Sequence, residues 1–304
     1  MRASLPQRSS TQSCLVCLCR TMTPILRYYS EELPKSLHKV AVCTNCGHMQ
    51  HFPILSKTFY EKVNDRKFNA EYMQAGVINS ATAQKKIKKL DKIISSHLKQ
   101  EGNVLDVGAG EAWSLKYFLS LCYRYFAIER VDDLASSIRA RGGVVLGRDL
   151  SDLERATEDT SFDFILFRHV LEHVVEPREI LSRLKALLAE DGLMLIVVPN
   201  SATPSIHKGF RTSFIRPVHI SYFCETTLAR LMAGVGLDVV YRDTVGEISF
   251  LVKAAESSRD YSESAYPEMK KTFLKKARER QLFDVLQMLR GRLYATLSRI
   301  FKAC

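Results

Sequence analysis

Asp106, Gly108 and Gly110 have the residue types and the spacing that suit the binding of a charged ligand. They lie where a short apolar run, residues 104–107, gives way to a helical pattern. Glycines at such a turn let the backbone approach a ligand closely, and the start of the helix offers unpaired N–H groups. A dinucleotide fingerprint would need a third glycine at the position of Trp113, and the Asp106 carboxylate would repel a pyrophosphate. The pattern therefore favours a cationic ligand with an ammonium and a sulfonium group.

A second acid, Glu129, ends the next apolar run, nineteen residues after Gly110. A carboxylate at the end of such a strand can accept two hydrogen bonds from a ribose diol. Proteins that bind NAD place an acid at the same point. Glu129 therefore indicates a nucleoside ligand without choosing between cofactors.

Five apolar runs alternate with helical patterns and must position these side chains. They cover residues 104–107, 125–128, 144–150, 162–167 and 193–198. Strands that alternate with helices form parallel βαβ units, so the sequence predicts an α/β fold. Apolar residues make up 46% of the 304, which provides a packed core and excludes global disorder. The longest purely apolar core run has six residues, far fewer than the roughly 20 that span a bilayer.

Short motifs follow these predicted strands in a fixed order. Residues 162–177 read FDFILFRHVLEHVVEP, and residues 217–223 read PVHISYF. With the acid and glycines described above, they resemble the class I S-adenosylmethionine (SAM) methyltransferases, in which an acidic residue precedes Gly-x-Gly and "LEHv" follows the fourth strand. The resemblance covers about residues 100–255. It implies a Rossmann-like seven-stranded methyltransferase sheet with helices on both faces, and SAM-dependent methyl transfer.

The resemblance also implies a set of cofactor-binding residues. Asp106 and Glu129 are expected at the aminoacyl and ribose ends of SAM, and Asp149 resembles the family's acid on the adenine side. The predicted cofactor set is Asp106, Gly108, Gly110, Glu129, Asp149, Leu150 and Arg168. The family usually has a further glycine where this chain has Ala112.

The acceptor side of this fold implies a second set of residues. Methyl transfer from SAM is an in-line displacement, so the enzyme must align the acceptor and remove or accommodate its proton. We predict His219 as the base, and His169 and Tyr222 as further catalytic residues. Val218 replaces the Glu of the "EHxxYF" pattern of sugar C-methyltransferases, which weakens a role in abstracting a proton from carbon.

The loop after the fourth strand leaves two alternatives open. Related quinone-pathway O-methyltransferases hold a divalent metal there with carboxylates and a histidine. Here His169 stands at the leading carboxylate position, followed by Glu172 and His173, which puts metal use in doubt. Glu172 and His173 can equally stabilise the loop and the helix that follows it.

Two Cys-x-x-Cys pairs near the start of the chain offer four thiolates for tetrahedral zinc. We predict Cys14, Cys17, Cys43 and Cys46 as the ligands of a structural zinc ion. Cys19 can compete for the first pair, which also lacks the glycine that follows the second pair at position 47. Ordinary reduced thiols are the alternative. The segment resembles the small zinc domain that precedes some sugar and small-molecule methyltransferases.

These patterns divide the chain into four segments. We expect a zinc-ribbon-like domain at 1–56, a helical linker or lid at 57–99, the SAM-binding domain at 100–255 and a basic amphipathic tail at 256–304. Residues 268–304 hold ten basic and three acidic side chains, so they carry +7 of the net charge of +11. A leucine stripe in this tail fits packing on the core or a partner chain, an anionic membrane surface, or nucleic acid.

The sequence therefore predicts a methyltransferase that acts on a small-molecule or sugar/glycan acceptor, with SAM and a structural zinc ion. It is expected in the cytoplasm, with the tail as a route to a membrane surface. Nucleic-acid methylation is the alternative enzyme class, but the Asn/Asp-Pro-Pro-aromatic motif is missing after the fourth strand. A degenerate SAM-fold scaffold is the non-enzymatic alternative, and the intact acids and glycines of the cofactor set argue against it.

Overall fold

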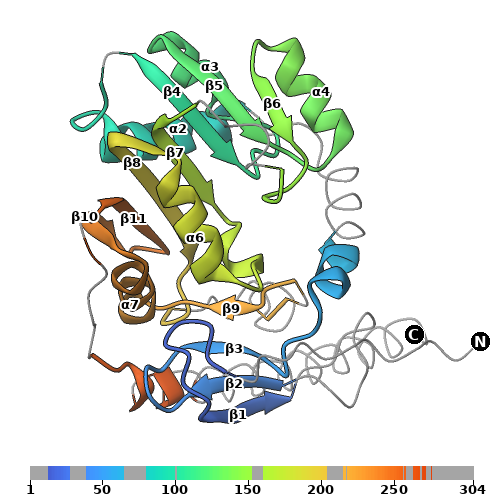
Figure 1. Cartoon of the computed structure of the whole chain (residues 1–304), viewed down its shortest axis with the longest axis vertical. Helices are drawn as coiled ribbons and strands as arrows, with labels where there is room; N and C mark the ends of the chain where they lie inside the picture. The colour runs from blue at the N-terminus through green and yellow to red at the C-terminus, as the bar shows by residue number, and fades with distance from the viewer. Residues whose placement is uncertain are drawn as a thin grey trace, which may run out of the picture.

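The computed structural model describes residues 13–27, 39–64, 80–99, 101–152, 160–203, 215–216, 218–255, 257, 263–267, 269–271 and 275. These residues form a large and a small β-sheet with helices around the large one (Figure 1). The leucine stripe predicted in the C-terminal tail lies outside the described residues.

The large sheet has seven strands in the order β10-β11-β8-β7-β4-β5-β6. The strands are β4 (Gly102–Val107), β5 (Tyr123–Ile128), β6 (Val144–Gly147), β7 (Phe162–Arg168), β8 (Leu188–Pro199), β10 (Leu237–Asp243) and β11 (Glu247–Ala254). Neighbouring strands are parallel from β6 to β8, whereas β11 is antiparallel to both of its neighbours. The predicted seven-stranded sheet is confirmed.

Strand β6 ends earlier than the apolar pattern of residues 144–150 predicts. The pattern extends to Leu150, but β6 ends at Gly147. The Asp152 carboxylate accepts hydrogen bonds from the N–H groups of Arg148 (2.7 Å) and Asp149 (3.2 Å). A side chain that captures these donors competes with strand pairing, so the chain turns here.

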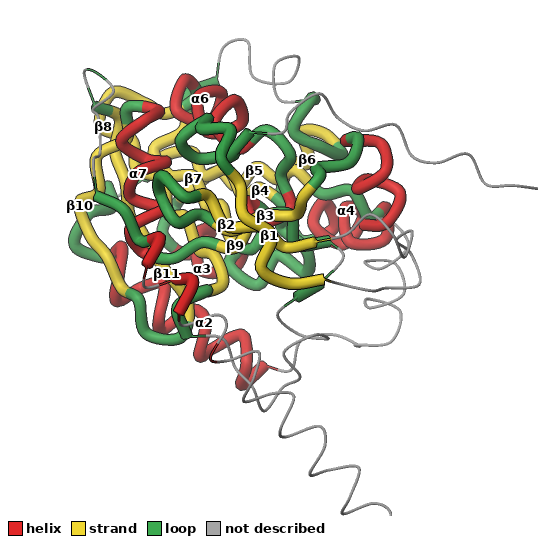
Figure 2. The backbone as a smooth tube through the Cα atoms, turned by 90° about the horizontal axis from the view of Figure 1, so that it is seen from below, coloured by secondary structure: helices red, strands yellow, loops and turns green. Residues whose placement is uncertain are grey.

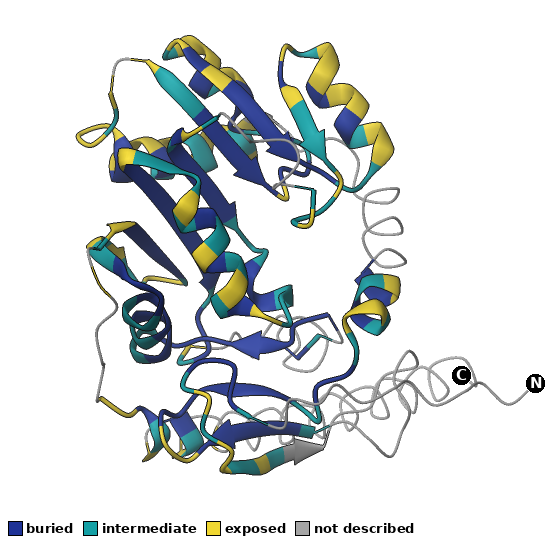
Figure 3. Cartoon of the chain, viewed as in Figure 1, coloured by how far each residue is buried: buried dark blue, intermediate teal, exposed yellow. Residues whose placement is uncertain are grey.

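Helices cover both faces of the large sheet, as predicted. Buried residues of α2 (Ser80–Ile94), α3 (Leu115–Ser120) and α4 (Asp132–Ala140) pack with one face. Those of α6 (Pro177–Ala186) and α7 (Glu225–Val235) pack with the other face. Figure 3 shows the buried strands between these layers, with exposed residues on the outer sides of α4 and α6.

The small sheet is antiparallel and combines two distant parts of the chain. Its order is β1 (Met22–Arg27), β2 (Lys39–Cys43), β3 (Met49–Phe52) and β9 (Ser221–Tyr222). Figure 2 shows β1, β2 and β3 in front of the large sheet. Since β9 pairs with β3 through Met49 and Tyr222, a segment of the predicted SAM-binding domain completes the N-terminal sheet.

Further contacts join the N-terminal region to the rest of the chain. The Arg178 guanidinium at the start of α6 donates to the carbonyl oxygens of Val16 (3.1 Å) and Gly234 (2.5 Å). The N–H of Ala265 donates to the Cys46 carbonyl oxygen at 3.2 Å, and the Met269 side chain is buried in the same cluster as the small sheet. The start of the predicted tail therefore packs on the N-terminal region.

Among the described helices, none has both the length and the apolar character that crossing a membrane requires.

Candidate active site

A cavity of about 830 Å³ opens at the carboxyl ends of the parallel strands. Strands β4, β5 and β7 bring Asp106, Glu129 and Arg168 to its wall, and the turn after β6 brings Asp149. Ligands of open α/β sheets bind at this edge, where the strand order reverses. Here the reversal falls between β7 and β4.

The glycine turn after β4 brings the backbone to the cavity. Gly108 and Gly110 have φ of 70° and 57°, in the region that favours glycine. The N–H groups of Gly108 and Ala109 donate to the Ile128 carbonyl oxygen at 2.9 and 3.2 Å, which fixes the turn against β5. A Cβ atom on Gly108 would lie 2.6 Å from Val170 Cγ2. Ala112, where the resemblance expects a glycine, has φ of 46°.

The Asp106 carboxylate is buried at the end of β4. Its Oδ2 accepts hydrogen bonds from Ser114 Oγ at 2.9 Å and from the Tyr125 hydroxyl at 2.5 Å. Burial raises the pKa of Asp106 to about 6, although both hydrogen bonds act to lower it.

Glu129 is buried on the other side of the glycine turn. Its Oε2 accepts from the Gly110 N–H at 2.6 Å, and its Oε1 accepts from the Val131 N–H at 2.8 Å. Burial raises the pKa of Glu129. Each carboxylate oxygen has a second lone pair, so Glu129 could accept one further hydrogen bond at each oxygen from a pair of ribose hydroxyls.

Asp149 and Leu150 lie in the turn after β6 and line the same cavity. Asp149 Oδ1 accepts from the Ser151 N–H at 2.8 Å. Burial acts to raise the pKa of Asp149, but the hydrogen bonds from Ser151 outweigh it, and the pKa lies below its usual value.

Arg168 and His169 meet Glu247 at the end of β7. Arg168 Nη2 lies 2.9 Å from Glu247 Oε1 and 3.2 Å from Oε2, and His169 Nε2 lies 2.8 Å from Oε1. Burial acts to lower the pKa of His169, but hydrogen bonds with Glu172 and Glu247 leave it raised. Arg168 therefore reaches the cavity as part of an ion pair.

The segments after β7 and before β9 bring two further histidines to the cavity. His173 Nδ1 lies 2.8 Å from the Val218 carbonyl oxygen, and the ring centroids of His173 and His219 are 4.9 Å apart. Burial lowers the pKa of both histidines, that of His219 well below its usual value. His219 is therefore neutral at pH 7.

Tyr222 is placed differently from the other predicted catalytic residues. It is buried in β9 and is not among the described residues that line the cavity. Its hydroxyl lies 3.2 Å from His51 Nε2, and His51 Nδ1 lies 3.3 Å from the hydroxyl of Tyr60, which does line the cavity. His51 of the small sheet thus connects Tyr222 to the cavity wall.

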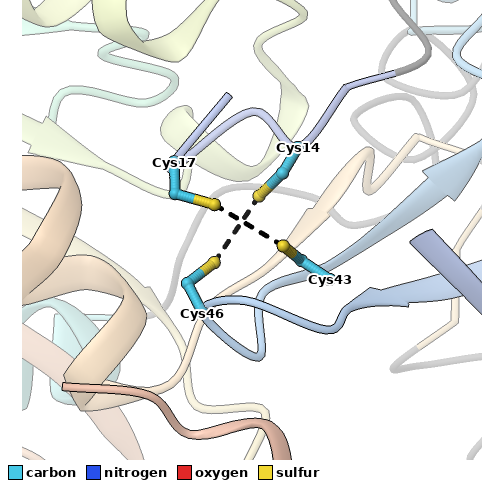
Figure 4. A group of neighbouring side chains, drawn as sticks. All are labelled: Cys14, Cys17, Cys43 and Cys46. Atoms are coloured by element: carbon cyan, nitrogen blue, oxygen red, sulfur yellow. Dashed lines mark hydrogen bonds between the residues drawn. The ribbon is translucent and has the colours of Figure 1, made fainter. Parts of the chain in front are cut away.

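The two Cys-x-x-Cys pairs converge at one end of the small sheet, and Figure 4 shows their four sulfur atoms pointing toward one another. The Sγ atoms of Cys14 and Cys46 are 3.6 Å apart, and those of Cys17 and Cys43 are 3.5 Å apart. All four lie within 4.8 Å of one another. Four sulfurs at about 2.3 Å from one zinc ion are separated by about 3.8 Å, so the spacing fits this metal.

Cys19, the competing ligand, is outside this cluster. Its Sγ lies 3.0 Å from Thr21 Oγ1. The first pair also makes its tight turn without a glycine, because Leu18 adopts φ of 62° where the second pair has Gly47 at 81°.

Several residues of the site carried no motif in the sequence. Tyr125 and Ser114 support Asp106, Glu247 links Arg168 with His169, and Asn64 faces the cavity from the helix that begins at residue 57. Of these residues, only Glu247 could have been placed at the site from the sequence. An acid at the start of the antiparallel strand must lie at the edge where the parallel strands end.

Comparisons with known proteins agree with this geometry. Residues 78–242 match a protein-family model described as a methyltransferase domain. No curated protein matches the chain.

Among similar solved structures, the first named here shares the fold. The 1,6-didemethyltoxoflavin-N1-methyltransferase of Burkholderia thailandensis, solved with 1,6-didemethyltoxoflavin and S-adenosylhomocysteine, is 22% identical with a TM-score of 0.53, covering 77% of this chain and 100% of its own. The PH0226 protein of Pyrococcus horikoshii is 16% identical (TM-score 0.48; 61% and 96% covered). A SAM-dependent methyltransferase of Clostridium acetobutylicum is 11% identical (TM-score 0.44; 65% and 98% covered).

Proposed function

Because the chain belongs to the class I SAM-dependent methyltransferases, we propose that it methylates a small-molecule or sugar/glycan acceptor. The observation that carries this proposal is that the acids predicted to bind the cofactor and a group of histidines line the same cavity. The cavity volume of about 830 Å³ lies within the range of small-molecule sites.

The cofactor half of the cavity offers partners for each part of SAM. Asp106 would face the ammonium group, Glu129 the ribose hydroxyls, and Asp149 with Leu150 the adenine. The glycine turn would let the backbone lie close to the cofactor. The carboxylate of SAM needs a cation, and Lys86 of α2 lines the cavity near enough to Arg168 for their charges to interact. Since Arg168 is paired with Glu247, Lys86 is the better candidate for this contact.

The other half of the cavity would hold the acceptor. Tyr60, Asn64 and His219 line it with polar atoms, and Asn64 Oδ1 has no hydrogen-bond partner among the described residues. A buried amide oxygen without a partner is unfavourable, and an acceptor that carries hydroxyl or amino groups would satisfy it. These features support a polar acceptor over a purely apolar one.

His219 is our candidate for the base. It is neutral at pH 7 and lines the cavity, so it can take the proton that the acceptor loses as the methyl group is transferred in line. His169 would orient the loop, because it is held between Glu172 and Glu247. Tyr222 would act as a positioning residue through His51.

We also propose that the four cysteines hold one structural zinc ion, with every coordination position filled by protein. The close approach of the four sulfurs supports this. Thiolates held as metal ligands need a reducing compartment, which supports the proposal of a cytoplasmic location. From the sequence of the basic tail we propose that it contacts a membrane surface or a partner chain.

The experiment that tests the function is transfer of a labelled methyl group from SAM into fractionated cell extract. We expect the label in a low-molecular-weight or glycan fraction with the wild-type chain and not with Asp106→Ala. Label in nucleic acid would instead support the alternative enzyme class. A wild-type chain that binds no SAM would support the scaffold alternative.

A further inference from the structure

Glu172 and Asn64 are two buried side chains that line the cavity, and each has one oxygen atom without a partner. Glu172 is 1% exposed and Asn64 is 7% exposed. Glu172 Oε2 and Asn64 Oδ1 have no hydrogen-bond partner among the residues that the structure describes. A buried oxygen without a donor is costly, so both atoms indicate a ligand that brings hydrogen-bond donors.

The Glu172 carboxylate is held through one of its two oxygens. Its Oε1 lies 3.1 Å from His169 Nδ1. Burial acts to raise the pKa of Glu172, but interactions with His169 and the other histidines outweigh it and leave the pKa at about 2. The charged carboxylate can only accept hydrogen bonds. The last torsion of a glutamate side chain is broad, so a small rotation turns Oε2 toward the cavity.

The candidate base lies beside this carboxylate. One oxygen of Glu172 and one ring nitrogen of His219 lie within 4.8 Å of each other. The neutral His219 ring has one nitrogen with a lone pair. A hydroxyl reaches about 2.7–2.8 Å to the atom that accepts its hydrogen. Two neighbouring hydroxyls of one molecule can therefore bond to His219 and to Glu172 at the same time.

The charges at this part of the wall favour neutral donors over an ammonium group. His169 contacts both Glu172 and Glu247, and Arg168 also pairs with Glu247. These four side chains comprise two acids and two basic groups, so the acids already face positive partners. Hydroxyl groups bring hydrogen to the remaining oxygen without adding a further charge.

We propose that Glu172 and Asn64 determine acceptor specificity by binding hydroxyl groups of a polyhydroxylated molecule such as a sugar ring. Glu172 accepts from the hydroxyl next to the one that lies at His219, and Asn64 accepts from a further hydroxyl. A catechol has only two hydroxyls, so it would leave Asn64 without a donor.

This inference rests on the proposed function and adds the acceptor class to it. In the transfer step the hydroxyl oxygen at His219 forms a bond to the methyl carbon of SAM. The carbon–sulfur bond breaks, sulfur keeps its electron pair, and His219 takes the hydroxyl proton. Glu172 and Asn64 hold the ring so that this oxygen is in line with the methyl group.

Periodate treatment of a protein-free cell extract tests the acceptor class. Periodate cleaves the carbon–carbon bond between neighbouring hydroxyls, and ethylene glycol consumes the excess before the full chain and labelled SAM are added. We expect the treated extract to lose most of the label that an extract given previously consumed periodate takes up. A mixture of the two extracts should still take up label, which shows that the oxidation products do not inhibit the enzyme.

The outcomes separate this inference from the proposed function. Equal label in the treated extract would overturn the polyhydroxylated acceptor and leave the proposed function standing. A labelled product that is an aromatic ether would also overturn the acceptor class. An untreated extract that takes up no label would overturn the proposed function, and this inference with it.

Glu172→Gln and Asn64→Ala test the two residues. Because each removes a hydrogen-bond acceptor for the ring, methyl transfer at limiting extract should fall about fivefold or more. SAM affinity by calorimetry should stay at the wild-type value, which also shows that the fold is intact. Glu190→Gln, at an exposed acid, is the matched control and should transfer like the wild type. Wild-type transfer by both variants would overturn their roles, and the periodate result does not depend on either variant folding.

Discussion

The Tyr125 hydroxyl of β5 donates to the carboxylate of Asp106, in the neighbouring strand β4, at 2.5 Å. Asp106 is buried, and this bond, together with the one from Ser114, is the main support of its charged form there. The pKa of about 6 is the balance between burial, which raises it, and these two donors, with smaller opposing effects of the Glu129 and Arg168 charges. Cofactor binding should therefore depend on pH through Asp106.

SAM affinity should fall as the pH drops below about 6. The ammonium group of SAM attracts the charged carboxylate, so at lower pH binding must first remove a proton from Asp106. The dissociation constant should then rise by up to about tenfold per pH unit. Calorimetry between about pH 5 and 8 measures this, and Asp106→Asn should flatten the dependence. An equally steep fall in Asp106→Asn would assign the effect to another group.

Tyr125→Phe should move this pH dependence upward. Without the hydroxyl donor the charged form of Asp106 loses support, so its pKa rises above about 6 and SAM binds more weakly at neutral pH. Tyr123→Phe is the matched control, because the Tyr123 hydroxyl donates to the Lys99 carbonyl oxygen instead. Identical pH profiles for both variants would show that the Tyr125 bond does not support Asp106.

Zinc content should separate the clustered cysteines from their neighbour. Cys43→Ser is expected to lose the zinc of the four-cysteine cluster and to destabilise the small sheet, because structural zinc sites contribute folding free energy. Cys19→Ser should keep it, since Cys19 Sγ bonds to Thr21 Oγ1. Elemental analysis and thermal unfolding measure the two effects. A metal-free wild type with intact unfolding behaviour would show that the cluster holds no zinc.

Leu18→Gly should stabilise the zinc-bound form. Leu18 is 60% exposed and has φ of 62°, a conformation that costs an L-residue about 1 kcal/mol and a glycine little. The greater entropy of glycine in the unfolded chain opposes this by about 0.4–1 kcal/mol, so we expect a small net gain of at most about 0.5 kcal/mol in the free energy of unfolding. Denaturant unfolding measures it, and a lower midpoint for Leu18→Gly would contradict the expectation.

Local patterns were sufficient to predict the large sheet. Its parallel strands are apolar runs, and the glycine turn, the acids and the "LEHv" segment follow them at fixed points. The pairs of cysteines likewise read as one cluster from their spacing alone. These features arise from residues that are close together in the sequence, so they can be recognised without knowing the tertiary structure.

Contacts between distant segments were not predictable in the same way. Nothing local in β9 shows that Tyr222 pairs with Met49 of the small sheet, or that its hydroxyl reaches His51. The pairing of Arg168 with Glu247 joins residues 79 positions apart, so a residue predicted to bind the cofactor lies in an ion pair. The first pair depends on how the two sheets meet, and the second depends on which strands of the large sheet end at the same edge.

Calorimetry of SAM binding to the wild type, Asp106→Ala and Glu129→Ala tests whether these two acids hold the cofactor. Each charge-assisted contact is typically worth about 1.5–3 kcal/mol, so each variant should bind SAM roughly tenfold or more weakly. Glu190→Ala, at an exposed acid away from the cavity, should bind like the wild type. Affinities in Asp106→Ala and Glu129→Ala that both equal the wild-type value would show that these acids do not bind SAM.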